Sequence, residues 1–216
     1  MARINYRGHT FTGPDGGRMW VPPDAVFTVT RPGFADLDLT LTGTVQKYSI
    51  GTRYEDIFGR VFRYVEYGGT IAQNSMVDAE IPDSVHDDLD LDTGGAAVGA
   101  LTLSVDSPES GTADFIANEY AQGWVFSELT VSDVALPIAS HPLWDISAAT
   151  SLTVTLFFPV RVAIAADSDL SFVKSKFKEV IIAAAATASV PVGANTGTGA
   201  VDGRFGWVQT RGPAKV

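Results

Sequence analysis

Glycine and proline interrupt this chain so often that few segments between them are long enough for more than a short strand. The sequence has 21 Gly and 11 Pro, and these residues favour turns over the interior of helices. Between them lie short segments rich in Val, Ile, Phe, Tyr and Thr, the residues typical of β-strands. Short strands joined by Gly-rich turns predict an all-β fold, either a β-sandwich or a barrel-like domain.

Three segments show how the strands are recognised. Residues 37–42 alternate strictly between apolar and polar side chains, which predicts a half-buried strand. Residues 60–67 follow a turn predicted at 56–59, and although their alternation is imperfect, β-branched and aromatic residues dominate. Residues 203–213 carry Phe205 and Trp207 between glycines, and they predict a late strand that closes the β domain with Trp207 inside.

Two regions depart from this pattern. Ser168–Phe177 predicts one short helix, because Leu170, Val173 and Phe177 have the spacing of one helix face and Asp167 or Ser168 can cap the helix. In residues 1–24 the glycines and prolines leave no regular period, which predicts an extended N-terminal arm or irregular lead-in. The remaining residues, 25–216, are predicted to form one β-rich body domain.

Little in the sequence points to catalysis. The chain has no cysteine, which excludes a disulfide, a thiol nucleophile and a zinc site with Cys ligands. The three histidines lie in separate polar or Pro-bounded stretches, where we expect surface or loop residues, and no GxSxG elbow accompanies them. We therefore expect no enzymatic activity, no catalytic residue and no cofactor.

Aspartates are concentrated in one segment in the middle of the chain. Asp88, Asp90 and Asp92 resemble the start of a calcium loop, but the Gly and the Glu that an EF-hand requires further along are missing. An exposed acidic loop is therefore preferred, an irregular calcium site is the alternative, and no metal site is assigned.

The net charge of −10 argues against direct binding to nucleic acid. The longest apolar stretch, residues 180–190, is shorter than the about 20 residues of a bilayer-spanning helix, so no membrane partner is expected. Basic residues nevertheless gather near both ends and in one cluster, and Trp20 lies in the predicted arm. The resulting candidates for a protein interface are Trp20, Arg3, Arg7, Lys174, Lys176, Lys178, Arg211 and Lys215.

The four tryptophans allow two interpretations. Trp20, Trp124, Trp144 and Trp207 could line a carbohydrate-binding face. Tryptophans in a β-rich chain of this size are more often core residues or subunit contacts, which is the preferred interpretation.

Three stretches form an ordered set. The first covers residues 41–77, with Ile50-Gly51-Thr52, the segment 56–65 and Gly68-Gly69. The second is 117–125, where Tyr120, a short gap and Gly123 precede an apolar strand. The third runs from residue 168 through 190–193 to 206–213. In this order they resemble the capsid decoration (head cement) proteins of tailed, chiefly marine, bacteriophages, and residues 1–40 lie outside the resemblance.

The resemblance implies a non-enzymatic virion structural protein. Such a protein would bind the major capsid protein on the outer surface of an icosahedral capsid and stabilise the shell against the pressure of the packaged DNA. It would be a homo-oligomer, with a trimer favoured. Two alternatives stay open: a carbohydrate- or receptor-binding β module of a phage fibre or spike, and a structural protein of the tail tube or head–tail junction.

Overall fold

The computed structural model describes residues 9–13, 16–21, 37–80, 86–87, 89–92, 94–106, 114–127, 134–145, 147, 151–166, 168–183 and 190–214. Across these ranges the protein is all-β and contains no α-helix, which confirms the predicted fold class. In the same ranges there is also no helix with the length and apolar character that a membrane span requires.

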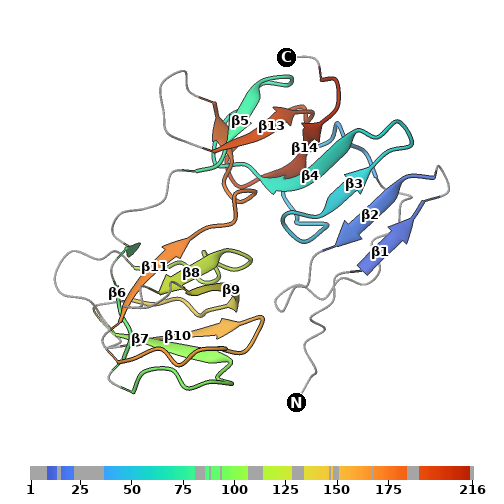
Figure 1. Cartoon of the computed structure of the whole chain (residues 1–216). Coiled ribbons are helices and arrows are strands. Elements are labelled where there is room, and N and C mark those ends of the chain that lie inside the picture. Colours follow the sequence, from blue (N-terminus) through green and yellow to red (C-terminus); the bar gives the residue numbers. More distant parts are fainter. Residues whose placement is uncertain are drawn as a thin grey trace. The chain divides into compact units, whose positions relative to one another are not determined.

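The chain divides into two compact units (Figure 1). Pro82–Ser175 builds one, here called the barrel unit, and Arg7–Ile81 with Lys176–Val216 builds the other, here called the sheet unit. The barrel unit is thus inserted into the sequence of the sheet unit. Its boundaries fall inside residues 25–216, which are predicted to form one body domain.

The barrel unit contains a six-stranded antiparallel sheet in the order β6-β11-β8-β9-β10-β7. The first and last strands of this order also meet, because Leu91, directly after β6, bridges Val105 of β7 and the Asp92 N–H donates to the Ser104 carbonyl at 2.9 Å. The sheet therefore closes on itself as a barrel, which leaves few unpaired strand edges. Its strands are β6 (Leu89–Asp90), β7 (Thr102–Asp106), β8 (Trp124–Ser127), β9 (Val134–Ser140), β10 (Ser151–Leu156) and β11 (Asp169–Val173).

The barrel interior is filled by alternate residues of these strands. Val125, Leu170 and Phe172 point inward and are buried, while their neighbours along each strand point outward. Phe115 and Trp144, which form an isolated bridge outside the named strands, add two large aromatic side chains to the same core. The alternation of buried and outward-pointing residues along β8 and β11 is the period-2 pattern of a strand with one face in the core.

The sheet unit contains an eight-stranded sheet in the order β1-β2-β3-β4-β14-β13-β5-β12, again with antiparallel strand pairs. The segments before and after the inserted barrel unit meet at the centre of this sheet, where β4 pairs with β14. Its strands are β1 (His9–Thr12), β2 (Arg18–Val21), β3 (Arg53–Glu55), β4 (Val61–Glu66), β5 (Met76–Asp78), β12 (Ile181–Ile182), β13 (Pro191–Asn195) and β14 (Phe205–Arg211).

The central strand β4 contributes apolar side chains to a hydrophobic cluster on each of its faces. Phe62 and Tyr64 pack into one hydrophobic cluster, which contains Trp207, whereas Val65 and the following Tyr67 pack into another on the opposite face. A strand buried on both faces has no need of strict alternation. This explains the imperfect alternation of residues 60–67.

The helix predicted at Ser168–Phe177 is wrong. Asp169–Val173 forms β11, with Leu170 and Phe172 buried in the barrel core and paired opposite Ser127 and Val125 of β8. The alternation of residues 169–173 decides the structure once a neighbouring strand supplies hydrogen bonds. Phe177, the third residue of the expected helix face, belongs to the sheet unit instead.

The described part of the predicted arm is a β-hairpin. β1 pairs with β2, β2 pairs with β3, and Met19 and Val21 are buried in the cluster that contains Trp207. The glycines that obscure the period make the turn, since the Gly13 N–H donates to the Gly17 carbonyl at 2.8 Å. Gly17 is also required sterically, because a Cβ there would lie 2.5 Å from the Tyr54 hydroxyl. Residues 1–8, 14–15 and 22–24 of the arm lie outside the described residues.

The strand predicted at residues 37–42 is also wrong. The Asp38 carboxylate accepts hydrogen bonds from the Thr40 N–H at 2.8 Å and the Thr40 hydroxyl at 2.7 Å, and residues 39–40 form a turn. Such short side-chain-to-backbone hydrogen bonds compete with a strand ladder.

Candidate functional site

Two histidines of the barrel unit, His86 and His141, lie outside the strands, as the expectation of surface or loop residues allows, but both are buried. His86 is 2% exposed and His141 is 3% exposed. His141 is held on both sides of its ring, because Nε2 accepts from the Tyr120 N–H at 3.0 Å and Nδ1 lies 2.9 Å from the Pro142 carbonyl. The Tyr120 hydroxyl lies 2.5 Å from His86 Nδ1. These contacts satisfy buried polar groups next to an aromatic core, which is a structural role.

The acidic segment gives no metal centre in the described part of the chain. Among those residues no group of three or more His, Cys, Asp or Glu side chains is placed to hold a metal ion. Asp90 is exposed but lies on strand β6 rather than in the exposed loop that was predicted, and Asp88 lies outside the described residues.

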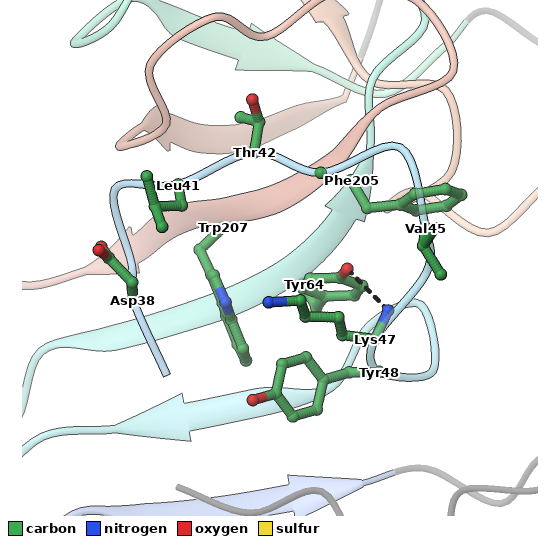
Figure 2. A pocket seen from close by; sticks show the side chains of 10 residues that line it. Asp38, Leu41, Thr42, Val45, Lys47, Tyr48, Tyr64, Phe205 and Trp207 are labelled. Atoms are coloured by element: carbon green, nitrogen blue, oxygen red, sulfur yellow. Dashed lines mark hydrogen bonds between the residues drawn. The ribbon is translucent and has the colours of Figure 1, made fainter. Parts of the chain in front are cut away.

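A pocket opens on the sheet unit beside Trp207 (Figure 2). Its floor consists of the buried rings of Trp207, Tyr48 and Tyr64, and its rim carries the exposed side chains of Leu41 and Val45. The rim is tied to the sheet because Gly43 exchanges two backbone hydrogen bonds with Phe205, at 2.9 and 2.8 Å. The remaining lining residues are Asp38, Thr42, Gly43, Lys47 and Phe205.

Polar groups at this pocket come from the loop that precedes β3. The Lys47 N–H donates to the Tyr64 hydroxyl at 3.1 Å, and the Lys47 side chain points toward Trp207 (Figure 2). Burial raises the pKa of Tyr64 to about 12, so this phenol stays protonated near neutral pH. Hydrogen bonds from Thr40, together with the positive charge of Lys47, hold the pKa of Asp38 below its ordinary value.

The size of the pocket limits what it can hold. Its volume is about 90 Å³, whereas pockets for small-molecule ligands usually measure about 300–1,000 Å³. It has room for a few water molecules or one side chain of a partner. The pocket therefore does not offer a substrate-sized active site.

The barrel unit presents an uncharged aromatic face, defined by Trp124, Phe126, Ala135, Pro137 and Val173. Trp124 and Phe126 are two residues apart on β8 and are 44% and 38% exposed. Trp124 pairs with Pro137 of β9 and with Val173 of β11, and Phe126 pairs with Ala135 of β9 and with the uncharged Ser171 of β11. Opposed residues of paired strands share a face, so these five side chains form one surface.

The three lysines of the predicted cluster differ in their surroundings. The Lys174 ammonium lies 3.1 Å from the Glu119 carboxylate inside the barrel unit. Lys176 belongs to the sheet unit, where its ammonium lies 5.1 Å from the centre of the Phe177 ring, and Lys178 is half-buried there.

The other predicted interface residues divide into those the structure describes and those outside it. Trp20 is 37% exposed on β2, and Arg211 is exposed at the end of β14. Arg3, Arg7 and Lys215 lie outside the described residues. Sequence reasoning missed Phe126, although its position two residues from Trp124 in a strand is the pattern that would have placed both on one face.

Comparison with protein-family models finds no match, and comparisons with curated proteins and with solved structures find none either. The resemblance to capsid decoration proteins therefore stays a prediction. The structure contributes three further observations: the fold, the pocket and the aromatic face.

Proposed function

We propose that this chain is a non-enzymatic virion structural protein, a decoration or cement protein that binds the outer surface of a capsid and stabilises the shell. The observation that carries the proposal is the uncharged aromatic face of the barrel unit. Its five residues include no charge, and the cores of protein–protein interfaces are likewise depleted of charge and enriched in aromatic residues. An exposed surface of this composition suits attachment to another protein rather than conversion of a substrate.

The resembling stretches support this proposal by their positions. The first stretch contributes β4 and the third contributes β14, which pair with each other at the centre of the sheet unit. The second stretch ends in β8, and the third contributes β11, where Trp124 pairs with Val173. Motifs that pair in space form the framework of each unit, as expected for a family defined by its fold rather than by a catalytic site.

The proposal includes the partners that the resemblance implies. The main partner is the major capsid protein, and the chain forms a homo-oligomer, with a trimer favoured. Attachment to a repeating lattice would stabilise the bound fold by mass action, which suits a protein with no cysteine and therefore no disulfide.

Cryo-electron microscopy of the particle that contains this chain tests the proposal. We expect its density on the outside of the shell, with Trp124 and Phe126 at the contact. Particles assembled with the double variant Trp124→Ala/Phe126→Ala should lose the protein, whereas Thr153→Ala, an exposed change on β10 of the same barrel, should leave attachment unchanged. Density inside a tail tube or at the head–tail junction, or absence from the particle, would refute the proposal.

A second candidate function is a carbohydrate- or receptor-binding module of a fibre or spike. The observation that favours it is the exposure of Trp124, because sugar rings stack on exposed aromatic side chains. Trp144, which is 1% exposed, cannot take part. A glycan array separates the two functions: saturable glycan binding that Trp124→Ala abolishes without unfolding the protein supports this second candidate.

A further inference from the structure

Strand register places four arginines on one face of the sheet unit. Arg53 of β3 lies between Trp20 of β2 and Arg63 of β4, with which it pairs. In the next row, Glu55 of β3 lies between Arg18 of β2 and Val61 of β4. Arg211 of β14 pairs with Val61 and so extends that row. We call this surface the arginine face; it consists of Arg18, Trp20, Arg53, Glu55, Arg63 and Arg211.

The opposite side of these strands is occupied by the core. Met19, Tyr54 and Phe62, which alternate with the arginine-face residues along β2, β3 and β4, are buried in the cluster that contains Trp207. The arginines therefore cannot rotate to the other face without breaking the register. Their clustering follows from the fold.

The charge of this face is opposite to that of the chain. Four arginines share it with one carboxylate, Glu55, whereas the whole sequence has 15 Lys and Arg against 25 Asp and Glu. Glu55 is already paired with Arg53 at 2.6 Å. Guanidinium groups carry five N–H donors each, so most of the donor capacity of the face is not used by Glu55.

Arg53 and Arg63 are direct cross-strand partners of like charge, an arrangement that destabilises a sheet. Burial and then the charge of Arg53 lower the pKa of Arg63. Arg63 is partly held in place, since it donates to the Gly51 carbonyl at 2.7 Å and lies over the Phe177 ring at 5.3 Å. An anion bound across Arg53 and Arg63 would relieve their repulsion.

We propose that the arginine face docks a carboxylate-rich surface of a partner protein. Guanidinium groups bind carboxylates through two parallel hydrogen bonds, and Trp20 supplies an apolar anchor next to them. Tryptophan and arginine together are the residues most enriched at the energetic centres of protein interfaces. Nucleic acid is the weaker alternative, because a chain of net charge −10 repels a polyanion beyond the immediate contact.

This inference deepens the proposed function and rests on it only for the identity of the partner, which would be a capsid surface rich in Asp and Glu. Peptide binding to the chain in solution can be measured without capsid particles. It can therefore fail while capsid attachment is observed, and it can succeed if the chain proves to bind a different protein.

The experiment measures binding of a fluorescent oligoglutamate peptide to the full chain by anisotropy. We expect saturable binding at low salt that weakens as the ionic strength rises. Arg53→Gln/Arg211→Gln should weaken it about tenfold, since each exposed charge pair contributes at most a modest amount. Arg161→Gln, a change at an exposed arginine of the barrel unit, should leave it unchanged.

Arg18→Gln is a second variant, at an exposed position. We expect it to weaken peptide binding less than the double variant does, and it still tests the proposal if the double variant does not fold. No binding of the peptide, or equal binding by the arginine-face and Arg161→Gln variants, would overturn the proposal. Tighter binding of a single-stranded DNA of matched charge would assign the face to nucleic acid instead. Sedimentation showing self-association of the wild type that the double variant loses would assign it to a second copy of this chain.

Discussion

Trp207 shows how one side chain ties several segments together. Its ring centre lies 5.4 Å from that of Tyr48, 5.2 Å from that of Tyr64 and 6.4 Å from that of Tyr54. Two of these contacts are edge-to-face and one is tilted, arrangements that aromatic pairs favour over flat stacking. Because the rings come from the 37–50 loop, β3, β4 and β14, removal of the indole would loosen the whole cluster.

Trp207→Ala should therefore lower the free energy of unfolding of the sheet unit by about 3–5 kcal/mol, the usual cost of truncating a buried aromatic. Chemical denaturation followed by circular dichroism measures this loss. Trp207→Phe, which keeps a ring in the cluster, should lose less than the alanine variant. The physical reason is the cavity that the alanine leaves among Tyr48, Tyr54 and Tyr64.

Trp20→Ala is the matched control in the same unit, because Trp20 is 37% exposed whereas Trp207 is 2% exposed. Its effect should stay within roughly 1 kcal/mol. Equal stability of the wild type and Trp207→Ala would show that Trp207 is not a core residue, and would reopen the pocket beside it as a binding surface.

The sequence was enough to predict that Trp207 is buried. It was not enough to predict which of the other three tryptophans are buried and which are exposed. Glycines around Phe205 and Trp207 mark a strand, and a strand near the end of a β-rich chain has a core available to it. Nothing local separates Trp124 from Trp144, however, since the outward direction of Trp124 depends on its pairing with Pro137 and Val173. The arginine face was missed for the same reason, because Arg53 and Arg63 meet only through strand register.

At the scale of single elements, a turn can be predicted from the few residues that form it. The predicted turn at 56–59 is confirmed, with the Gly59 N–H donating to the Asp56 carbonyl at 3.1 Å between β3 and β4. Turn chemistry is local, so it can be recognised in a few residues. The helix predicted at 168–177 is wrong because the strand that forms there, β11, depends on pairing with β8, and no local pattern reveals this partner.

Asp56 makes the stability of this turn depend on pH. Its carboxylate accepts from the Phe58 N–H and the Arg60 N–H, each at 2.9 Å, and from the Arg60 Nε–H at 2.6 Å. Partial burial acts to raise the pKa of Asp56, but these hydrogen bonds and the charge of Arg60 outweigh it and leave the pKa below its ordinary value. The charged form is therefore favoured in the folded state.

A depressed pKa in the folded state means that stabilisation is complete above the unfolded pKa of about 3.9 and is lost as the pH falls through the folded value. Asp56→Asn should thus be less stable than the wild type at pH 7 by about 1 kcal/mol, after allowance for solvent screening. The difference should shrink below about pH 4. Thermal unfolding at a series of pH values measures it, and Asp90→Asn, an exposed residue of β6, is the control. A constant difference at every pH would contradict this role for the carboxylate.

At the scale of the whole molecule, the insertion of one unit into another could not be read from the sequence. β4 and β14 lie on either side of the inserted barrel unit in the sequence and still pair as neighbours, and a local period carries no information about such a pairing. The barrel unit differs in this respect. Its strands find their partners within Pro82–Ser175, and its core residues run from Leu89 to Phe172.

These observations predict that residues 82–175 fold without the rest of the chain. A sheet that closes on itself leaves few edges for aggregation, and a segment of this size can bury a core of its own. We expect the isolated segment to give a well-dispersed amide spectrum and one cooperative thermal transition. The structural reason is the Leu91–Val105 bridge, which joins the first and last strands of the barrel without help from the sheet unit.

Closure itself can be tested with two matched variants of the isolated segment. Val105→Asp places a charge at a position that is fully buried in the barrel core, and should abolish the cooperative transition because an unpaired charge there is not solvated. Thr102→Asp, an exposed change on the same strand β7, should preserve it. An isolated wild-type segment that is unfolded, while the full chain gives two folded units by limited proteolysis, would show that the barrel needs the sheet unit to form.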